Sequence, residues 1–285
     1  MPEVFWHLFS IGIVMSNLRI IYNNIADSAT ISASSTASGF SAANLKTTQK
    51  TSVHRSTTGT VTYTLTWTSA QNISAVALPA TNLTAAATIR VQLFAETTDT
   101  EVIGDTGTLT ACRDRVIELH GNISTPTYKD FGFGGATKTS VWLNRTYIAK
   151  KVVITLTNST AIDCARIVCG TYWESTRQAS NGITLDFSDS SEVTTTRSGN
   201  TYVDRKPITD NISLDLAYIS DVDRRELLKI MRSWGSNGLV YLCVFPDNTN
   251  PELTQSYSIY GRSQNNNIQY QLHSLYNTAL TINSW

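Results

Sequence analysis

The chain has 285 residues and carries 22 basic and 22 acidic side chains, so its formal net charge is zero. Charged residues make up only 15% of the sequence, and no run of lysine and arginine marks a nucleic-acid surface. The length allows one large domain or two ordinary ones, and either arrangement can bury a core. Threonine is frequent in alternating segments, which favours β structure.

An apolar run without alternation, residues 4–14, lies near the start of the chain. It is too short for a transmembrane helix, and it lacks the basic flank and cleavage site of a signal peptide. Two explanations stay open. Either Met15 is the natural start, or residues 1–15 form a hydrophobic arm that docks on a neighbouring subunit.

The four cysteines are Cys112, Cys164, Cys169 and Cys243, and none of them forms a Cys-x-x-Cys pair. Cys164 and Cys169 fall in one predicted strand, five residues apart, and therefore point to opposite faces. We expect buried thiols that behave as small apolar side chains. The four histidines are widely separated, so we expect no metal site, and no motif indicates a cofactor.

Residues 16–175 are predicted to form a β-sandwich of the jelly-roll type, because short alternating strands follow one another with polar turns between them. In the clearest strand, residues 61–68, Val61, Tyr63, Leu65 and Trp67 alternate with four threonines. We expect Trp67 in the core. The other predicted strands are residues 18–25, 29–35, 73–78, 89–95, 116–119, 140–143, 151–157 and 165–171.

A polar connector, residues 175–182, precedes a segment of different character. Residues 182–285 are predicted to form a small α+β domain, with one helix on an antiparallel sheet. A polar, mobile stretch, residues 188–210, separates two of its strands. The predicted strands are residues 183–187, 212–217, 239–245, 256–261, 268–275 and 279–282.

The one strongly predicted helix runs from Ser220 to Trp234. Ser220 with Asp223 resembles a capping box, and Gly235 follows the last turn. The apolar positions approximate a single face that would pack on the sheet. These positions are Val222, Leu227, Ile230, Met231 and Trp234.

The sequence contains no catalytic motif of the serine hydrolase, zinc protease, P-loop or dinucleotide-binding type. Asp186, Asp189 and Glu192 are spaced like a carboxylate pair for glycoside cleavage, but they fall in a polar stretch. No apolar neighbours in that stretch would raise the pKa of one of these carboxyl groups, as a general acid requires. We therefore interpret the three residues as part of a solvated loop. We therefore predict no catalytic residues and a protein that is not an enzyme.

The first half resembles the discoidin-like (galactose-binding-like) jelly roll carried by bacteriophage tail proteins. The resemblance rests on short motifs along most of this half, with His54 standing where tryptophan is common. The matching residues are Asn44, Leu45, Arg55, Ser56, Asn82, Leu83, residues 87–91, Arg166 and residues 170–174.

The second half is similar to the distal-tail-like partner domain of those proteins. The similarity includes Arg197, Ser198 and Gly199 after an acidic stretch, and the segment of the predicted helix. It also includes residues 245–247 and 260–262. The resemblance implies a structural protein of the virion, located in the phage tail at the tail tip or baseplate. It further implies assembly with other tail proteins, and we predict a homo-oligomeric ring built through this domain.

A glycine-rich segment with two phenylalanines, residues 131–135, offers a candidate contact loop, although a flexible connection between strands explains it as well. Sugar rings stack on aromatic faces, while their hydroxyls need polar partners. The predicted ligand-binding residues are Phe131, Phe133, Trp142 and Asn144.

Two functions therefore follow from the sequence. The first is a non-enzymatic phage structural protein, whose jelly roll either binds host surface glycan or only braces the tail. The alternative is a secreted carbohydrate-binding module protein. Neither requires nucleic acid or a membrane span.

Overall fold

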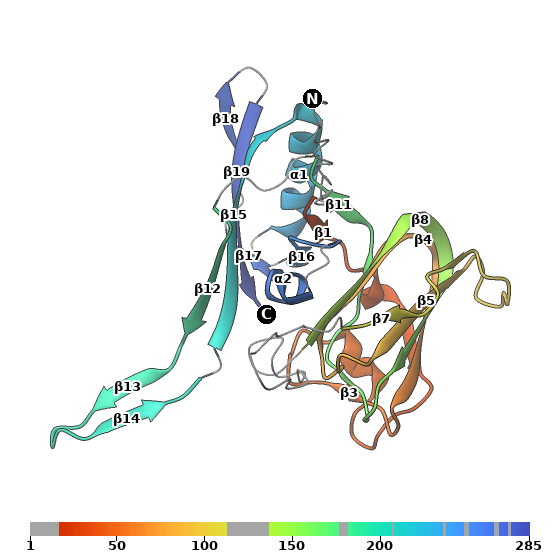
Figure 1. Cartoon of the computed structure of the whole chain (residues 1–285), viewed down its shortest axis with the longest axis horizontal. Helices are drawn as coiled ribbons and strands as arrows, with labels where there is room; N and C mark the ends of the chain where they lie inside the picture. Colours follow the sequence, from red (N-terminus) through yellow and green to blue (C-terminus); the bar gives the residue numbers. More distant parts are fainter. Residues whose placement is uncertain are drawn as a thin grey trace, which may run out of the picture.

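The computed structural model describes residues 17–112, 137–176, 182–206, 208–235, 238–247, 251–264, 268–272 and 275–285. They form a β-sandwich and a second domain in which one long helix packs on an antiparallel sheet (Figure 1). The predicted fold class, a β-sandwich followed by a small α+β domain, is confirmed. Residues 1–15, the predicted strand 116–119, Phe131 and Phe133 lie outside the described residues.

Two very long strands, β4 and β8, organise the sandwich and pair with each other along most of their length. Their pairing contains shifts in register, and both strands bend from one layer of the sandwich to the other (Figure 1). The sandwich sheet contains β2 (Thr30–Ala33), β3 (His54–Arg55), β4 (Thr60–Thr81), β5 (Thr88–Phe94), β6 (Gly104–Asp105), β7 (Leu109–Thr110), β8 (Thr137–Thr157), β9 (Asp163–Cys164) and β10 (Val168–Gly170). Two short 3₁₀ helices, η1 (Ile25–Ser28) and η2 (Ala42–Lys46), pack beside it.

The first half of β4 has the predicted alternation, with Val61, Tyr63, Leu65 and Trp67 all buried in the sandwich core. The Trp67 side chain is 4% exposed, and its Nε1 donates a hydrogen bond to the carbonyl of Ile25 at 2.9 Å. The prediction that Trp67 belongs to the core is confirmed.

The second half of β4 is buried on both of its faces, which explains its unbroken apolar sequence. Val76 and Leu78 face the sandwich core. Ala75 and Ala77 face the second domain and share a separate cluster with Tyr241. The two domains therefore meet directly across this strand.

The second sheet takes strands from both ends of the segment that we assigned to the sandwich. Residues 18–25 and 170–174 were predicted to open and close the jelly roll, but β1 (Arg19–Ile21) and β11 (Tyr172–Glu174) pair with each other instead. β1 also pairs with β16 (Leu239–Cys243), which belongs to the second sheet. The sandwich is therefore inserted between β1 and β11, two adjacent strands of that sheet. This pairing is non-local, and the alternation of a three-residue strand does not reveal it.

The remaining strands of the second sheet overlap the predicted segments, but β15 begins four residues earlier than predicted and a short second helix, α2, was not predicted. The longest pair joins β15 and β19, and α1 covers one face of the sheet (Figure 1). These elements are β12 (Thr184–Asp189), β15 (Ile208–Ile219), α1 (Asp221–Trp234), α2 (Pro251–Ser256), β17 (Ser258–Ser263), β18 (Gln269–Leu272) and β19 (Leu275–Ser284).

Helix α1 begins and ends where the sequence predicts. The hydroxyl of Ser220 accepts a hydrogen bond from the backbone of Asp223 at 3.2 Å, and Gly235 adopts a positive φ of 55°. The placement of Val222 on the apolar face is wrong, because its side chain is 68% exposed. At 100° per residue, Val222 falls well away from the stripe of Leu227 and Trp234.

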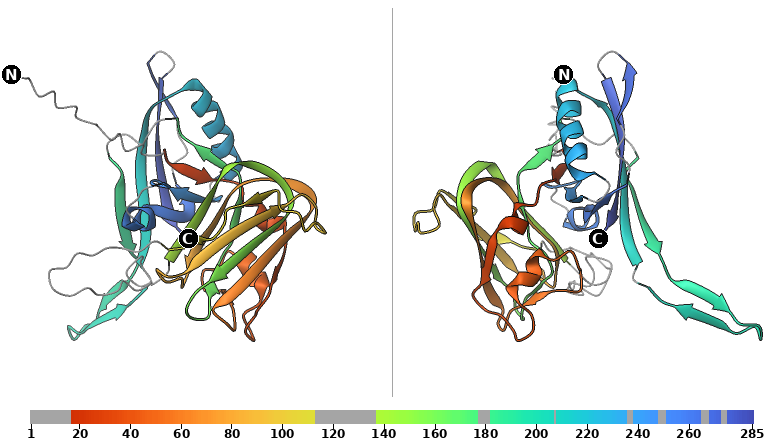
Figure 2. Two further views of the ribbon diagram at one scale, coloured as in Figure 1. Left: turned by 45° about the vertical axis from the view of Figure 1, so that its right-hand side comes forward. Right: turned by 180° about the vertical axis from the view of Figure 1, so that it is seen from behind.

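The stretch predicted to be polar and mobile contains a regular two-stranded hairpin, β13 (Glu192–Thr195) paired with β14 (Thr201–Asp204). This hairpin continues from β12 and β15 and projects away from both domains (Figure 2). Every residue of its two strands is exposed.

The cysteines are buried thiols, as predicted. Cys164 and Cys169 lie in two different strands rather than in the single strand expected. Burial raises the pKa of each of these two thiols to about 12, and that of Cys243 to about 11, so none is a reactive thiolate near neutral pH. Within the described part of the chain, no helix has the length and apolar character needed to cross a membrane.

Candidate functional site

Trp142, one of the predicted ligand-binding residues, lies in β8 where the two domains meet. Its ring contacts Tyr172 edge-on, with centroids 5.3 Å apart, and Tyr241 in a tilted arrangement at 6.3 Å. The Arg19 guanidinium lies 5.5 Å from the ring centroid of Trp142. Trp142 therefore lies in a strand, consistent with the predicted strand 140–143, and its ring packs between the domains.

Asn144 lies two residues further along β8, also in a strand and not in a loop. Its side chain is exposed and accepts a hydrogen bond from the hydroxyl of Tyr147 at 3.2 Å. Phe131 and Phe133 lie outside the described residues, so the structure does not show whether the four predicted residues form one site. Their role in ligand binding stays a prediction.

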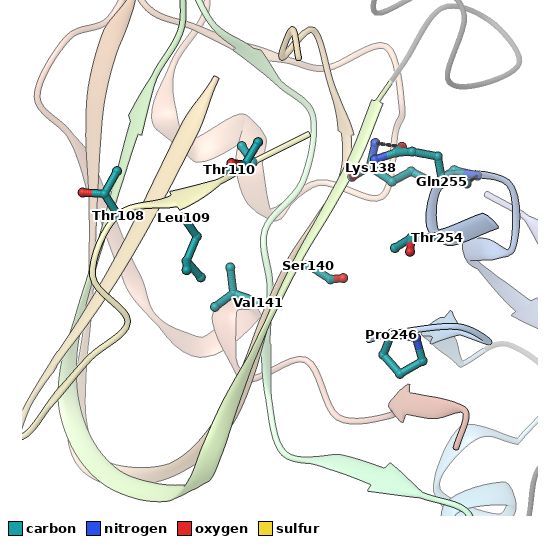
Figure 3. A pocket seen from close by; sticks show the side chains of 10 residues that line it. Thr108, Leu109, Thr110, Lys138, Ser140, Val141, Pro246, Thr254 and Gln255 are labelled. Carbon is teal, nitrogen blue, oxygen red and sulfur yellow. Dashed lines mark hydrogen bonds between the residues drawn. The ribbon is translucent and has the colours of Figure 1, made fainter. Parts of the chain in front are cut away.

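A cavity of about 340 Å³ lies at the junction of the two domains (Figure 3). Apolar side chains from Leu109, Val141 and Pro246 contribute to its wall, and hydroxyl-bearing residues supply most of the rest. The lining residues are Thr108, Leu109, Thr110, Ala111, Lys138, Ser140, Val141, Pro246, Thr254 and Gln255.

Lys138 joins the sandwich to the second domain at one end of this cavity. Its Nζ donates to the carbonyls of Ser258 at 2.6 Å and Gln255 at 3.3 Å, and lies 3.6 Å from a carboxylate oxygen of Asp210. Burial lowers the pKa of Lys138, and the nearby Asp210 carboxylate opposes that shift. The hydrogen-bond donors of the Lys138 Nζ are therefore used by acceptors within the protein, and the role of this side chain is structural.

The Gln255 side chain pairs with the backbone of Lys138 as a neighbouring strand would. Its Oε1 accepts from the Lys138 amide at 2.9 Å, and its Nε2 donates to the Lys138 carbonyl (Figure 3). The side-chain amide of Gln255, on α2, thereby provides hydrogen-bond partners for the backbone N–H and C=O of Lys138, at the edge of β8. This contact fixes one wall of the cavity.

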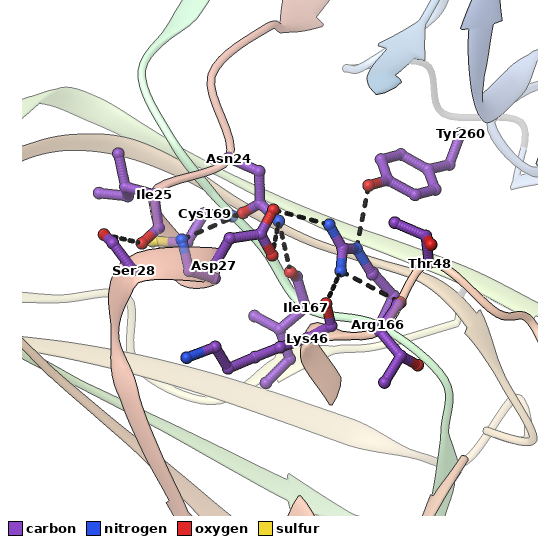
Figure 4. Close-up of polar contacts among 12 residues, drawn as sticks. Asn24, Ile25, Asp27, Ser28, Lys46, Thr48, Arg166, Ile167, Cys169 and Tyr260 are labelled. Carbon is purple, nitrogen blue, oxygen red and sulfur yellow. Dashed lines mark hydrogen bonds and ion pairs between the residues drawn. The ribbon is translucent and has the colours of Figure 1, made fainter. Parts of the chain in front are cut away.

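Arg166 forms a second link between the domains, and its side chain is only 2% exposed. Its Nη2 donates to the carboxylate of Asp27 at 2.8 Å, and its Nε donates to the hydroxyl of Tyr260 at 3.0 Å (Figure 4). Its Nη1 donates to the carbonyls of Lys46 and Thr47. Burial raises the pKa of Asp27, and Arg166 opposes that shift. The guanidinium therefore bridges η1, η2 and the second sheet.

The carboxylates considered for glycoside cleavage are exposed, but the prediction that they lie in a loop is wrong, because Asp186 and Asp189 belong to β12 and Glu192 to β13. Asp186, Asp189 and Glu192 are all exposed, and Glu192 pairs with Lys206 at 2.6 Å. Hydrogen bonds from Ser191 lower the pKa of Asp189, which is the opposite of what a general acid needs. In the described part of the chain, no group of three or more His, Cys, Asp or Glu side chains is arranged to hold a metal ion.

The sequence analysis missed Lys138 and Gln255, and it identified Arg166 only through the family resemblance. Lys138 occupies an ordinary alternating position, so its sequence context carries no signal. A fully buried arginine is unusual, but its neighbours Ala165 and Ile167 are apolar on both sides, which is the only local hint.

Several solved structures match about half of this chain. A chitosan-binding module derived from a chitosanase/glucanase of Paenibacillus sp. IK-5 is 17% identical, over 52% of this chain and 99% of the module, with a TM-score of 0.37. The lectin domain of lectinolysin, solved with Lewis b antigen, is also 17% identical, over 52% of this chain and 95% of that domain, with a TM-score of 0.36. A fucose-binding module of Streptococcus pneumoniae is 13% identical, over 53% of this chain and 99% of the module, with a TM-score of 0.36.

These matched structures are carbohydrate-binding proteins with low similarity to this chain. No protein-family model and no curated protein matches the sequence. Similarity at this level carries no argument about ligands. The assignment of a β-sandwich therefore rests on the strand topology described above.

Proposed function

We propose that the protein is a non-enzymatic structural component of a phage tail tip or baseplate, and that it assembles through its second domain. The observation that carries this proposal is the exposed hairpin β13–β14, which extends the second sheet beyond the body of the protein. The Arg197, Ser198 and Gly199 motif of the tail-protein resemblance lies in the turn of this hairpin. Exposed strand edges and exposed apolar side chains are common features of surfaces that bind another molecule.

The contacts between the domains support a bracing role for the sandwich. Arg166, Lys138 and the cluster around Trp142 all join the sandwich to the second sheet. Because the sandwich is inserted between β1 and β11, two chain connections hold it. A domain held in this way transmits force without a flexible linker.

Localisation in particles tests this proposal. Antibodies against the purified full chain should label one end of the tail of intact phage particles from a producing strain, viewed by electron microscopy. Mass spectrometry of the same particles should detect the chain. Its absence from purified particles would refute the proposed role.

The alternative function is carbohydrate binding by the sandwich, with Phe131, Phe133 and Asn144 as the proposed contact residues. Single-site affinity for a sugar would be weak, near millimolar, and display of several copies would raise it by avidity. A multivalent display of the chain should be tested on arrays that include chitosan, fucose and Lewis b, the ligands named for the matched modules. A lack of binding by the intact display would leave only the bracing role.

A matched pair of variants sharpens the glycan test. Phe133→Ala and Asn144→Ala should reduce binding if these residues form the site. Trp142→Ala is unsuitable, because the ring packs between the domains and its loss would disturb the fold. Ile148→Ala, at an exposed position on the same strand as Asn144, serves as the control.

A further inference from the structure

The ion pair between Lys138 and Asp210 joins the two domains. Lys138 belongs to β8 of the sandwich, and Asp210 belongs to β15 of the second sheet. The Lys138 Nζ lies 3.6 Å from the Asp210 Oδ2, and the two side chains are only 13% and 10% exposed. Of the ion pairs between described residues, this is the one in which both side chains are largely buried. The fold therefore places an amine beside a carboxyl group with little access to water.

Asp210 lies at the start of the apolar row that β15 turns toward the core of the second domain. Ile212 and Leu214 follow at alternate positions and are buried in that core. The Asp210 Oδ1 is buried and has no hydrogen-bond partner among the described residues. A carboxylate is costly in such a place, because burial removes its hydration. Transfer of a proton from the Lys138 ammonium to this carboxylate removes both charges, and burial lowers the pKa of Lys138 in the same sense.

The protein holds the Lys138 Nζ in a way that suits attack on Asp210. The Nζ donates to the backbone carbonyls of Ser258 at 2.6 Å and Gln255 at 3.3 Å. A neutral amine has two N–H groups and one lone pair, and the two carbonyls can only accept hydrogen bonds. They therefore take both N–H groups, which leaves the lone pair for the Asp210 carboxyl group. Two groups held in contact in this way react as parts of one molecule, which removes much of the entropic cost of their encounter.

We propose that Lys138 and Asp210 condense to form an amide bond between their side chains, which links the sandwich covalently to the second domain. The Nζ attacks the Cγ of the protonated Asp210 carboxyl group, so a C–N bond forms and a C–O bond breaks. The leaving hydroxyl takes one hydrogen from the nitrogen and departs as water, and the step uses no oxidant or reductant. Burial favours the product, because one neutral amide replaces two charged groups.

Lys150 and Glu96 provide an internal comparison within the sandwich. The Lys150 Nζ lies 2.8 Å from a Glu96 carboxylate oxygen, which is closer than in the pair of Lys138 and Asp210. The Lys150 and Glu96 side chains are 28% and 54% exposed, so water stabilises both charges. The neutral forms that condensation needs are therefore rare near neutral pH. We expect an amide bond at Lys138 and none at Lys150.

Mass spectrometry of the full chain, purified in its folded state and kept near neutral pH, tests this proposal. The intact wild-type chain should be lighter than its sequence requires by one water molecule. Trypsin should no longer cleave after Lys138, and the digest should contain a branched peptide that joins the Lys138 segment to the Asp210 segment. Asp210→Asn keeps the shape of the side chain and should form the same bond with loss of ammonia instead of water. Lys138→Arg should keep its full mass.

The sequence of the linked peptide distinguishes this reaction from others that release water. A wild-type chain of full sequence mass that trypsin cleaves after Lys138 would overturn the proposal. A loss of water that the digest assigns to Asp210 alone, or to Lys150 and Glu96, would overturn it as well. Circular dichroism establishes whether the two variants are folded, and the wild-type mass and digest decide the proposal without them.

Discussion

The two domains bury their apolar residues to very different extents. Within the described residues, the sandwich exposes only two large apolar side chains, Leu109 and Ile148, whereas the second domain exposes eight. The sandwich encloses its own core between layers formed by β4 and β8. The second domain has a core under α1, but the hairpin β13–β14 projects beyond that core.

This difference indicates which of the two domains still has apolar surface for a partner to cover. In its described residues the sandwich leaves little apolar surface exposed, because its core is enclosed and the outer face of β4 is covered by the second domain. A domain that leaves apolar groups uncovered at both ends is shaped for association. The following predictions test the contrast between a self-contained sandwich and a second domain that needs a partner, from the largest expected effect to the smallest.

Truncation in the sandwich core should have the largest effect. Trp67→Ala should lower the free energy of unfolding by about 3–5 kcal/mol, because it removes a buried ring. It also removes the hydrogen bond from Nε1 to the Ile25 carbonyl. Denaturant unfolding followed by circular dichroism measures the change. Trp67→Phe keeps most of the volume and should cost less, and a loss below about 1 kcal/mol for Trp67→Ala would contradict the core assignment.

Loss of Arg166 should have the next largest effect, because it links the two domains. Arg166→Met should lower the free energy of unfolding by about 3 kcal/mol, since it leaves the carbonyls of Lys46 and Thr47 without their donor. The domains should also unfold in separate steps once this link is lost. Asp27→Asn is the matched control and should cost less than about 1 kcal/mol, because Asp27 is half exposed. If the two substitutions lowered the free energy of unfolding equally, the stabilisation by Arg166 would come from its ion pair with Asp27 alone.

The sequence predicted elements whose pattern is local and missed arrangements that depend on distant partners. The alternation from Val61 to Trp67 and the cap at Ser220 each lie within a few residues, so both elements were found. The pairing of Ile20 with Leu242 joins residues far apart in the sequence, and no local pattern encodes it. The apolar run in the second half of β4 predicted a buried strand, but it could not show that Ala75 and Ala77 face the second domain.

The candidate site was less predictable than the fold for the same reason. Trp142 was identified as an aromatic residue suited to contact, and the structure shows that its contacts are with the second domain. An aromatic ring packs equally well on a ligand or on another domain, so residue type alone does not distinguish the two. Lys138 gave no signal because burial of a lysine depends on its surroundings in the folded chain.

Acid should destabilise the sandwich through His54. The imidazole is buried, with Nδ1 2.9 Å from the hydroxyl of Tyr63, and burial lowers its pKa from the ordinary value near 6.5. The unfolded state therefore binds a proton more readily than the folded state. The contribution of His54 to stability is fully present above about pH 6.5 and is lost as the pH falls from there through the lowered pKa. The difference in the free energy of unfolding between the wild type and His54→Gln should be smaller at about pH 5 than at about pH 7.5. A constant difference would contradict the lowered pKa.

The smallest effect on stability should come from the hairpin β13–β14, where association should change instead. Tyr202→Ser should alter the free energy of unfolding by less than about 0.5 kcal/mol, because the ring is exposed and touches no core. The same substitution should weaken association through the second domain about tenfold, since it removes an exposed aromatic ring from the hairpin on which the proposed assembly role rests. Leu109→Ser, at an exposed apolar position of the sandwich, should change neither quantity. If Tyr202→Ser instead lowers stability by more than about 1 kcal/mol without affecting association, the hairpin packs on its own chain and the contrast between the two domains fails.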